Sequence, residues 1–364
     1  MSIIKKAPAY VLYKMGKLLD QNTATLDPLG LDQYFVSGSF SEAAMATDSA
    51  PILALVARVV VPIRVTIVDN LDEVEAMAAA RDLNMFASAV TRFGVSLHQL
   101  PHLEELLLLL AEKTCEVPTD TVFGYGTRNP KGQRQRSFTK SEEESLFIDS
   151  FSSGMNGLMV TLAGLEMIQD MNITHPRFVQ IVREASQYLR TMEEAILAVR
   201  QKITPEFFTN RMRPFFDPKV LQGNTYFAAG GAQMPVTMID LLLWGVEDGD
   251  RAYVGYRNEN VRYLPRSYRS KVETIMTKPS ILRSVAGQLD AGVMEKSPDA
   301  VKEALIALRE FADQMIRFRG PHLGIAKANM RMRTEGSVGS GGYTVSILEY
   351  LIKATKYFKV SMAC

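Results

Sequence analysis

The stretch that decides the fold is "SEEESLFIDSFSSGMNGLMVTLAGLEMIQDM", residues 141 to 171. Ser141 can cap a helix, and Glu144 stands three residues later, which is the spacing of a reciprocal capping box. The pattern predicts one long helix from Ser141 to about residue 171. Along it, small residues recur every three or four positions and make one face nearly flat; they are Ser153, Gly157, Thr161 and Gly164. Such a face accepts either another helix or a broad, flat ligand.

The rest of the chain repeats helical periodicity with helix start signals, and strict two-residue alternation is nearly absent. Thr204 before Pro205 and Ser297 before Pro298 each place a capping hydroxyl ahead of a proline at the first helical position. The sequence therefore predicts an all-α protein.

Composition limits the classes of function. The 364 residues are 47% hydrophobic, which excludes a disordered chain. Their net charge is only +1, so the protein lacks the basic electrostatic field that would attract nucleic acid. The apolar runs at 52–68 and 103–113 are too interrupted or too short to span a membrane, and no signal peptide opens the chain. Two distant cysteines, Cys115 and Cys364, fit a reduced environment. We expect a cytoplasmic protein without nucleic-acid or membrane partners.

The clearest break in the chain is the stretch 124–141, which is rich in glycine, polar and basic residues. It predicts a boundary near 137, between a smaller N-terminal helical domain at 1–137 and a larger one at 138–364. The basic cluster within it is interpreted as a solvated loop in preference to a nucleic-acid contact; its members are Arg128, Lys131, Arg134 and Arg136.

The signatures of the common enzyme classes are missing, including the dinucleotide, phosphate-loop, zinc-protease and serine-hydrolase motifs. His98 and His102 stand four apart, but Pro101 between them breaks the helical register that zinc would need. His175 is predicted to lie at the surface, near a helix start.

His322 is a different kind of residue, because three apolar residues precede it at seven-residue intervals. Val301, Leu308 and Met315 place it on the core face of a helix. One interpretation is a hydrogen-bonded core histidine. The other is a haem held by a single axial imidazole, which an apolar pocket with Arg317 and neighbouring arginines would suit.

The chain resembles the indoleamine and tryptophan dioxygenase superfamily in five ordered segments over about 140 residues. "RFRGPHL" (317–323) and "GSGGY" (339–343) are similar to its axial-histidine and glycine-loop segments. Three more agree in order and approximate spacing: "ITPEFFTNRMRPFFDP" (203–218), "FAAGGAQMPVTMIDLLLWG" (227–245) and "YLPRSYRS" (263–270). Within the superfamily the pyrrolnitrin-forming branch is the most similar, so 138–364 is expected to be the haem- and substrate-binding domain.

The resemblance implies roles for individual residues. His322 corresponds to the proximal iron ligand of haem b, and Arg319 to a partner of a haem propionate. Arg213 falls where the dioxygenases bind the substrate carboxylate. Ser340, with a hydroxyl near the substrate amine, is implied as a catalytic and substrate-binding residue, and Gly341 as a substrate-binding residue of the same loop. Gly231 and Ala232, after Gly230, match the small-residue turn beside the haem.

The same resemblance has departures. Leu162 stands where an indoleamine dioxygenase has a distal serine, and Leu158 replaces a phenylalanine; both are expected beside the substrate. No distal base is evident. Four glycines between Gly336 and Gly342 predict a mobile loop that orders when substrate binds, in preference to a plain helix linker.

Three functions remain open at this stage. The first is a haem-dependent oxidative enzyme of antibiotic or other specialised biosynthesis, which acts on tryptophan or a related aromatic amino acid, halogenated forms included, with dioxygen, by oxygen activation or ring rearrangement. The second is a tryptophan 2,3-dioxygenase that forms N-formylkynurenine. The third is a non-catalytic haem- or ligand-binding protein. The chain is expected to be a monomer or a homodimer.

Overall fold

A computed structural model of the chain describes residues 2–230, 233–245, 251–332, 339 and 341–363. Nearly all of its regular structure is helical, as the sequence predicts. The elements are η1 (Ile4–Lys6), α1 (Pro8–Thr25), α2 (Asp32–Ser37), α3 (Ser39–Ala44), α4 (Ala50–Val59), α5 (Val65–Asn70), α6 (Glu73–Thr91), η2 (Leu97–Gln99), α7 (Pro101–Thr114), η3 (Phe123–Thr127), η4 (Gly132–Arg134), α8 (Glu142–Gln169), α9 (Phe178–Lys202), α10 (Pro205–Phe207), η5 (Phe208–Met212), η6 (Arg213–Phe216), β1 (Lys219–Leu221), β2 (Asn224–Tyr226), α11 (Val236–Leu243), α12 (Arg251–Arg262), α13 (Arg266–Met276), α14 (Ile281–Asp290), α15 (Val293–Lys296), α16 (Pro298–Arg331) and α17 (Val345–Ser361).

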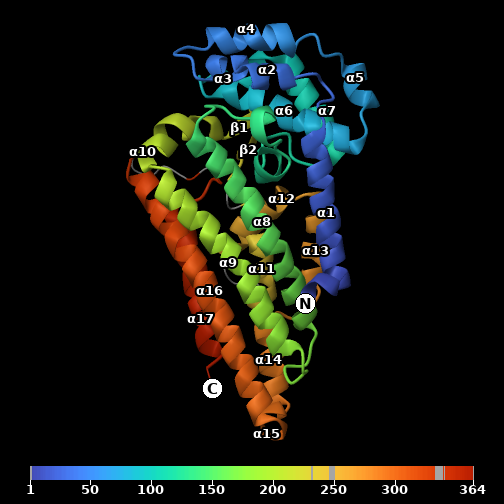
Figure 1. Cartoon of the computed structure of the whole chain (residues 1–364), viewed down its shortest axis with the longest axis vertical. Coiled ribbons are helices and arrows are strands. Elements are labelled where there is room, and N and C mark those ends of the chain that lie inside the picture. The colour runs from blue at the N-terminus through green and yellow to red at the C-terminus, as the bar shows by residue number, and fades with distance from the viewer. Residues whose placement is uncertain (1, 231–232, 246–250, 333–338, 340, 364) are drawn as a thin grey trace.

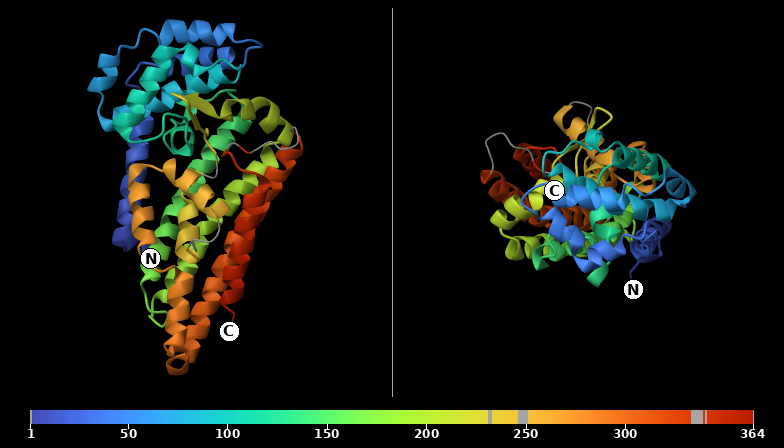
Figure 2. Two further views of the ribbon diagram at one scale, coloured as in Figure 1. Left: turned by 180° about the vertical axis from the view of Figure 1, so that it is seen from behind. Right: turned by 90° about the horizontal axis from the view of Figure 1, so that it is seen from above.

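The molecule is elongated (Figures 1 and 2). The long helices α8, α9, α16 and α17 run along its long axis, and α2 to α7 gather at one end of them. α1 lies along α8 and reaches from that end toward the middle of the bundle, where the Tyr13 hydroxyl donates to Glu166. The division into domains at residue 137 stays a prediction.

The flat face of α8 packs against α9, so the first of the two interpretations of its small residues is confirmed. A side chain at Gly157 would put its Cβ 1.9 Å from Thr191 Oγ1 and 2.2 Å from the Tyr188 carbonyl oxygen. Thr161 donates across the same contact to the Ala185 carbonyl, at 3.1 Å. Only glycine at 157 lets the two helices approach this closely.

The start of α8 confirms half of the predicted capping box. The Ser141 hydroxyl accepts from the Glu144 amide at 3.2 Å, as expected. The Glu144 carboxylate does not return to the Ser141 amide; it is fully buried and accepts from Tyr125, Ser137 and other groups of the preceding segment. The acid therefore ties η3 to α8.

The two other predicted caps differ in outcome. The Thr204 hydroxyl accepts from the Phe207 amide at 3.1 Å, so this cap is confirmed. α16 begins at Pro298 as predicted, but the Ser297 side chain makes no capping hydrogen bond.

The prediction of a solvated basic loop at 124–141 is wrong for Arg128 and Arg136, whereas Lys131 is exposed and Arg134 is partly exposed. Arg128 is buried between Asp20 and Glu116, with a guanidinium nitrogen 2.8 Å from Asp20 Oδ1. Arg136 is fully buried and lies 2.8 Å from Asp82 Oδ1. The acids that pair with these two arginines come close to them only in the folded chain. The composition of the segment alone therefore suggested a solvated loop. The segment instead joins α1 and α6 to the start of α8.

The apolar runs are parts of buried helices, and the short β1–β2 hairpin is antiparallel. Across the described ranges, no helix has the length and apolar character needed to cross a membrane.

α16 carries the predicted seven-residue register. Val301, Leu308 and Met315 are fully buried, and His322 follows on the same face, half-buried. Pro321 lies inside the helix and cannot donate a backbone hydrogen bond to the residue one turn earlier, yet the helix continues to Arg331.

Candidate functional site

A cavity of about 500 Å³ lies where four long helices meet η5. Its wall combines the first turns of α8, the last turns of α9, the second half of α16 and the first turn of α17. The volume lies within the range of small-molecule and cofactor sites. This cavity contains His322 and Arg213, which are more than a hundred residues apart in the sequence.

His322 faces the cavity with both ring nitrogens free of partners within the described part of the chain. Its ring is stacked near Phe318, with 6.2 Å between ring centroids. Burial, helped by the positive charge of Arg319, lowers the pKa of His322 to about 4. The imidazole is therefore neutral at physiological pH, with a lone pair available to a ligand.

Arg213 is buried in the opposite part of the wall. One of its guanidinium nitrogens donates to Asp217 Oδ1 at 2.6 Å, and Asp217 is half exposed. Arg213 begins η6, and the following Pro214 supports the helical turn that directs the side chain inward. Asp217 therefore orients the guanidinium, whose planar set of donors matches a carboxylate in geometry.

The described lining of the cavity includes basic side chains, one of which, Arg213, is paired with Asp217 outside the lining. Among its described lining residues the cationic side chains are Arg200 and Arg213, and none of the lining residues is an aspartate or glutamate. Arg200 lies in the last turn of α9 and is exposed. A lining of this kind favours an anionic ligand.

The remainder of the lining is mostly apolar and aromatic. Phe147 and Phe151 of α8 lie edge to face at 5.0 Å between ring centroids, and Phe208 of η5 lies 5.7 Å from Phe147. These rings form a wall suited to a flat aromatic group.

The structure does not bring every predicted residue to this cavity. Arg319 is directed away from it, onto Asp240, Thr355 and the Leu351 carbonyl. Leu158 and Leu162 are fully buried in the core and do not line it.

Two described glycines after α16 also line the cavity, the first being Gly339. The second is Gly341. At Gly342 the backbone has φ +79°, and a Cβ would lie 2.2 Å from Phe227 Cζ, so only glycine fits there. Ser340, Gly231 and Ala232 lie outside the described residues, as does most of the predicted mobile loop.

Sequence reasoning missed several polar lining residues, among them Arg200, Thr209 and Asn329. Thr209 stands four residues before Arg213, a helical spacing that could have found it. Arg200 and Asn329 have no comparable signal.

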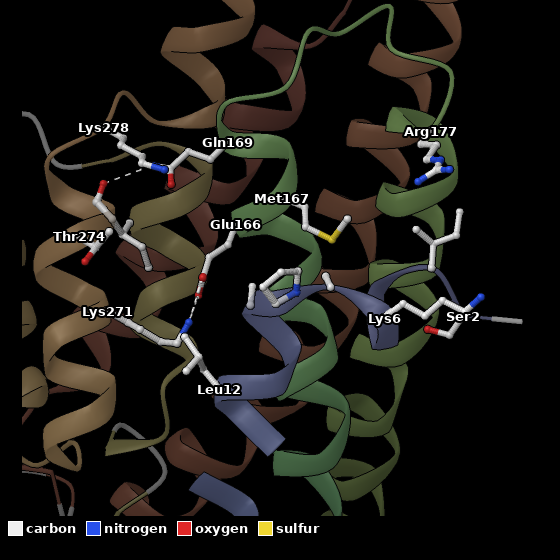
Figure 3. Close-up of a pocket in the computed structure, with 15 residues that line it drawn as sticks. Ser2, Lys6, Leu12, Glu166, Met167, Gln169, Arg177, Lys271, Thr274 and Lys278 are labelled. Carbon is white, nitrogen blue, oxygen red and sulfur yellow. Dashed lines mark hydrogen bonds and ion pairs between the residues drawn. The ribbon is translucent and has the colours of Figure 1, made fainter. Parts of the chain in front are cut away.

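A second hollow lies between the N-terminal segment and α13, and Figure 3 shows its lining. Lys271 lies 3.0 Å from Glu166, and Lys278 is paired with Asp170. Lys271 on α13 and Lys278 just after it are therefore paired with acids, and the described lining has no histidine, which makes this hollow a weaker candidate than the cavity at His322.

The histidine pair at 98 and 102 does not form a metal site. The His102 imidazole is bonded to the Ile63 carbonyl at 2.7 Å, and the described ranges contain no group of three or more potential metal-binding side chains. His175 is exposed, as predicted.

Comparison with protein families places most of the chain within a known family. The model of the family described as monodechloroaminopyrrolnitrin synthase PrnB matches residues 68–359. The matched segment starts just before α6, ends within α17 and includes every described residue of the cavity wall.

Proposed function

The chain belongs to the monodechloroaminopyrrolnitrin synthase PrnB family, a family of enzymes, and on that basis we propose that it is a haem-dependent oxidative enzyme of antibiotic biosynthesis. Its substrate is tryptophan or a related aromatic amino acid, halogenated forms included. The observation that carries the proposal is His322, a neutral imidazole in the wall of a large apolar cavity, with no hydrogen-bond partner among the residues that the structure describes.

The residues present fit a haem. A half-buried imidazole with no hydrogen-bond partner among the described residues costs free energy unless a ligand binds it, and a haem iron would be such a ligand. The apolar wall suits the porphyrin, and the positive charge of Arg200 suits its propionates. When bound, the haem supplies the redox chemistry by which dioxygen oxidises the substrate.

The residues around His322 hold it ready for that role. Arg319, one helical turn earlier, is fixed by Asp240, and its positive charge disfavours protonation of the imidazole. We assign Arg319 this indirect role, since its guanidinium is engaged away from the cavity.

Arg213 is the proposed partner of the substrate carboxylate. A guanidinium matches a carboxylate in geometry and charge, and Asp217 limits the directions in which Arg213 can turn. Exclusion of water by the surrounding apolar wall strengthens this contact.

The aromatic ring of the substrate is proposed to pack against the phenylalanines of the wall. Phe147 and Phe151 take the place on α8 that sequence comparison had given to Leu158 and Leu162. On the glycine segment, Gly341 offers its backbone, and Ser340 stays the proposed catalytic hydroxyl near the substrate amine.

One experiment tests the proposal. The purified chain is assayed for haem by its absorption spectrum, then reduced and supplied with dioxygen and with tryptophan or chlorinated tryptophans, and its products are identified by mass spectrometry. A rearranged product supports the leading function, and N-formylkynurenine indicates a 2,3-dioxygenase. Haem binding without any product indicates a carrier, and absence of haem contradicts the proposal.

A further inference from the structure

We propose that Thr209 is a positioning residue of the cavity, whose hydroxyl donates a hydrogen bond to the same ligand carboxylate that Arg213 binds. The inference rests on the proposed function, because it assumes a carboxylate ligand at Arg213. It adds a second, uncharged contact that neither the family match nor the sequence motifs assign.

The first observation is an unsatisfied hydroxyl. Thr209 lines the cavity, its Oγ1 atom is buried, and this oxygen has no hydrogen-bond partner among the residues that the structure describes. A buried hydroxyl left without a partner costs free energy, so a site that keeps one generally supplies the partner in another way. Here that partner comes from the content of the cavity.

The second observation is a contrast with other threonines in helices of this chain. Thr23, Thr161 and Thr355 each donate to the carbonyl oxygen four residues earlier, at 2.7–3.0 Å. Thr209 makes no such bond. It lies in η5, a wider π-helical turn, so the usual local acceptor is not engaged and the hydroxyl stays available to the cavity.

The third observation is its place beside Arg213. The two residues stand four apart on consecutive turns and both line the cavity. A carboxylate between them can accept from the hydroxyl through one oxygen and from the guanidinium through the other.

Charge selects the carboxylate over the amine of an amino acid. The lining includes Arg200 and Arg213 and, among the described residues, no acidic side chain. An ammonium group in this part of the cavity would meet like charge, whereas a carboxylate meets complementary charge. The Thr209 hydroxyl therefore acts as a donor to the anion.

The test compares Thr209→Val, which removes the hydroxyl at nearly constant shape, with Thr209→Ser, which retains it. Each full-length protein, as purified with the cofactor it carries, is titrated calorimetrically with three probes. Tryptophan has both carboxylate and amine, indole-3-propionate lacks the amine, and tryptamine lacks the carboxylate. Unfolding midpoints of the variants establish that the fold is retained.

Thr209→Val is expected to weaken the binding of tryptophan and of indole-3-propionate about tenfold and to leave the binding of tryptamine unchanged. The affinities of Thr209→Ser are expected to stay within about threefold of those of the original protein. Equal affinities of Thr209→Val and the original protein for both carboxylates overturn the inference and leave a water as the partner. A loss confined to tryptophan overturns it in favour of the amine.

Arg213→Leu, titrated in parallel, separates this inference from the proposed function. If Arg213→Leu weakens the binding of both carboxylate probes and Thr209→Val does not, the proposed function is supported and the role of Thr209 is wrong. If the original protein binds neither carboxylate, or if Arg213→Leu binds both unchanged, the proposed carboxylate site and the role of Thr209 fall together.

Discussion

Arg319 and Asp240 form a buried ion pair, with 2.5 Å between a guanidinium nitrogen and a carboxylate oxygen and with at most 5% of either side chain exposed. The pair connects α16 to α11 directly behind the cavity histidine. It gives Arg319 a structural partner within the protein, so the residue does not need a cofactor to satisfy its charge.

Removal of one partner of this pair should destabilise the protein strongly. Arg319→Met leaves Asp240 buried without its cation and should lower the free energy of unfolding by about 3–5 kcal/mol. The double variant Arg319→Met/Asp240→Leu should recover most of the loss, because neither charge then remains. Urea unfolding measures both. An unchanged stability of Arg319→Met, together with loss of haem, would instead support a direct contact with a propionate.

His322→Ala should abolish stoichiometric haem binding, because the cavity then lacks the imidazole proposed to hold iron. The Soret absorbance per protein measures it. His175→Ala, at an exposed site, is the matched control and should keep its full haem content. A normal Soret band in His322→Ala would remove the axial assignment.

Arg213→Leu should leave haem in place and weaken tryptophan binding by about 2–5 kcal/mol, since a charge-assisted contact in a dry pocket is lost. The Soret shift on titration with tryptophan reports the midpoint. The control is Arg211→Leu, because Arg211 is exposed on the same turn and does not line the cavity. An unchanged midpoint for Arg213→Leu contradicts the assignment.

Gly157→Ala should lower the free energy of unfolding by about 1–3 kcal/mol or more, because its Cβ would overlap backbone and side-chain atoms of α9. The control is Gly287→Ala, at an exposed helical position with nothing within 4 Å of the new Cβ. That change should stabilise the protein by about 0.5–1 kcal/mol. Thermal unfolding of the two variants provides the comparison, and equal effects would contradict the tight α8–α9 contact.

Asp120 should make stability depend on pH. Burial raises the pKa of Asp120 from 3.8 to about 7, against the opposing charge of Lys219. Because the folded state holds this proton more tightly than the unfolded state does, the bound proton stabilises the protein at low pH. This stabilisation is lost as pH rises from about 4 to about 7. Over that pH range, the free energy of unfolding of Asp120→Asn should therefore rise by about 3 kcal/mol relative to that of the original protein. Urea unfolding at pH 4.5 and pH 7.5 tests it, and a constant difference contradicts it.

The sequence predicted those features that depend on local periodicity. The register that ends at His322 and the helix that starts after Ser141 are both present, because buried positions repeat with the period of a helix. The fold class and the family followed from the same segments.

Features that depend on distant partners could not be predicted in this way. Asp240 is 79 residues from Arg319, and Asp20 is 108 residues from Arg128, so nothing near either arginine in the sequence reveals where it points. Leu158 and Leu162 were placed by counting along α8, and a shift of a few residues was enough to miss the cavity wall. Thr209 was missed because an unsatisfied hydroxyl becomes visible only once the backbone around it is known.

The position of α1 has a consequence for synthesis of the chain. Tyr13 bonds to Glu166, which is 153 residues further on, and the Ile3 amide bonds to Glu184, which is 181 residues away. At about 5–20 residues per second, the ribosome needs roughly 8–30 s to add the partner of Tyr13 after Tyr13 itself. Throughout that interval the nascent α1 lacks α8, its main packing partner. The first molecules that it can contact are therefore the ribosome and the chaperones near it.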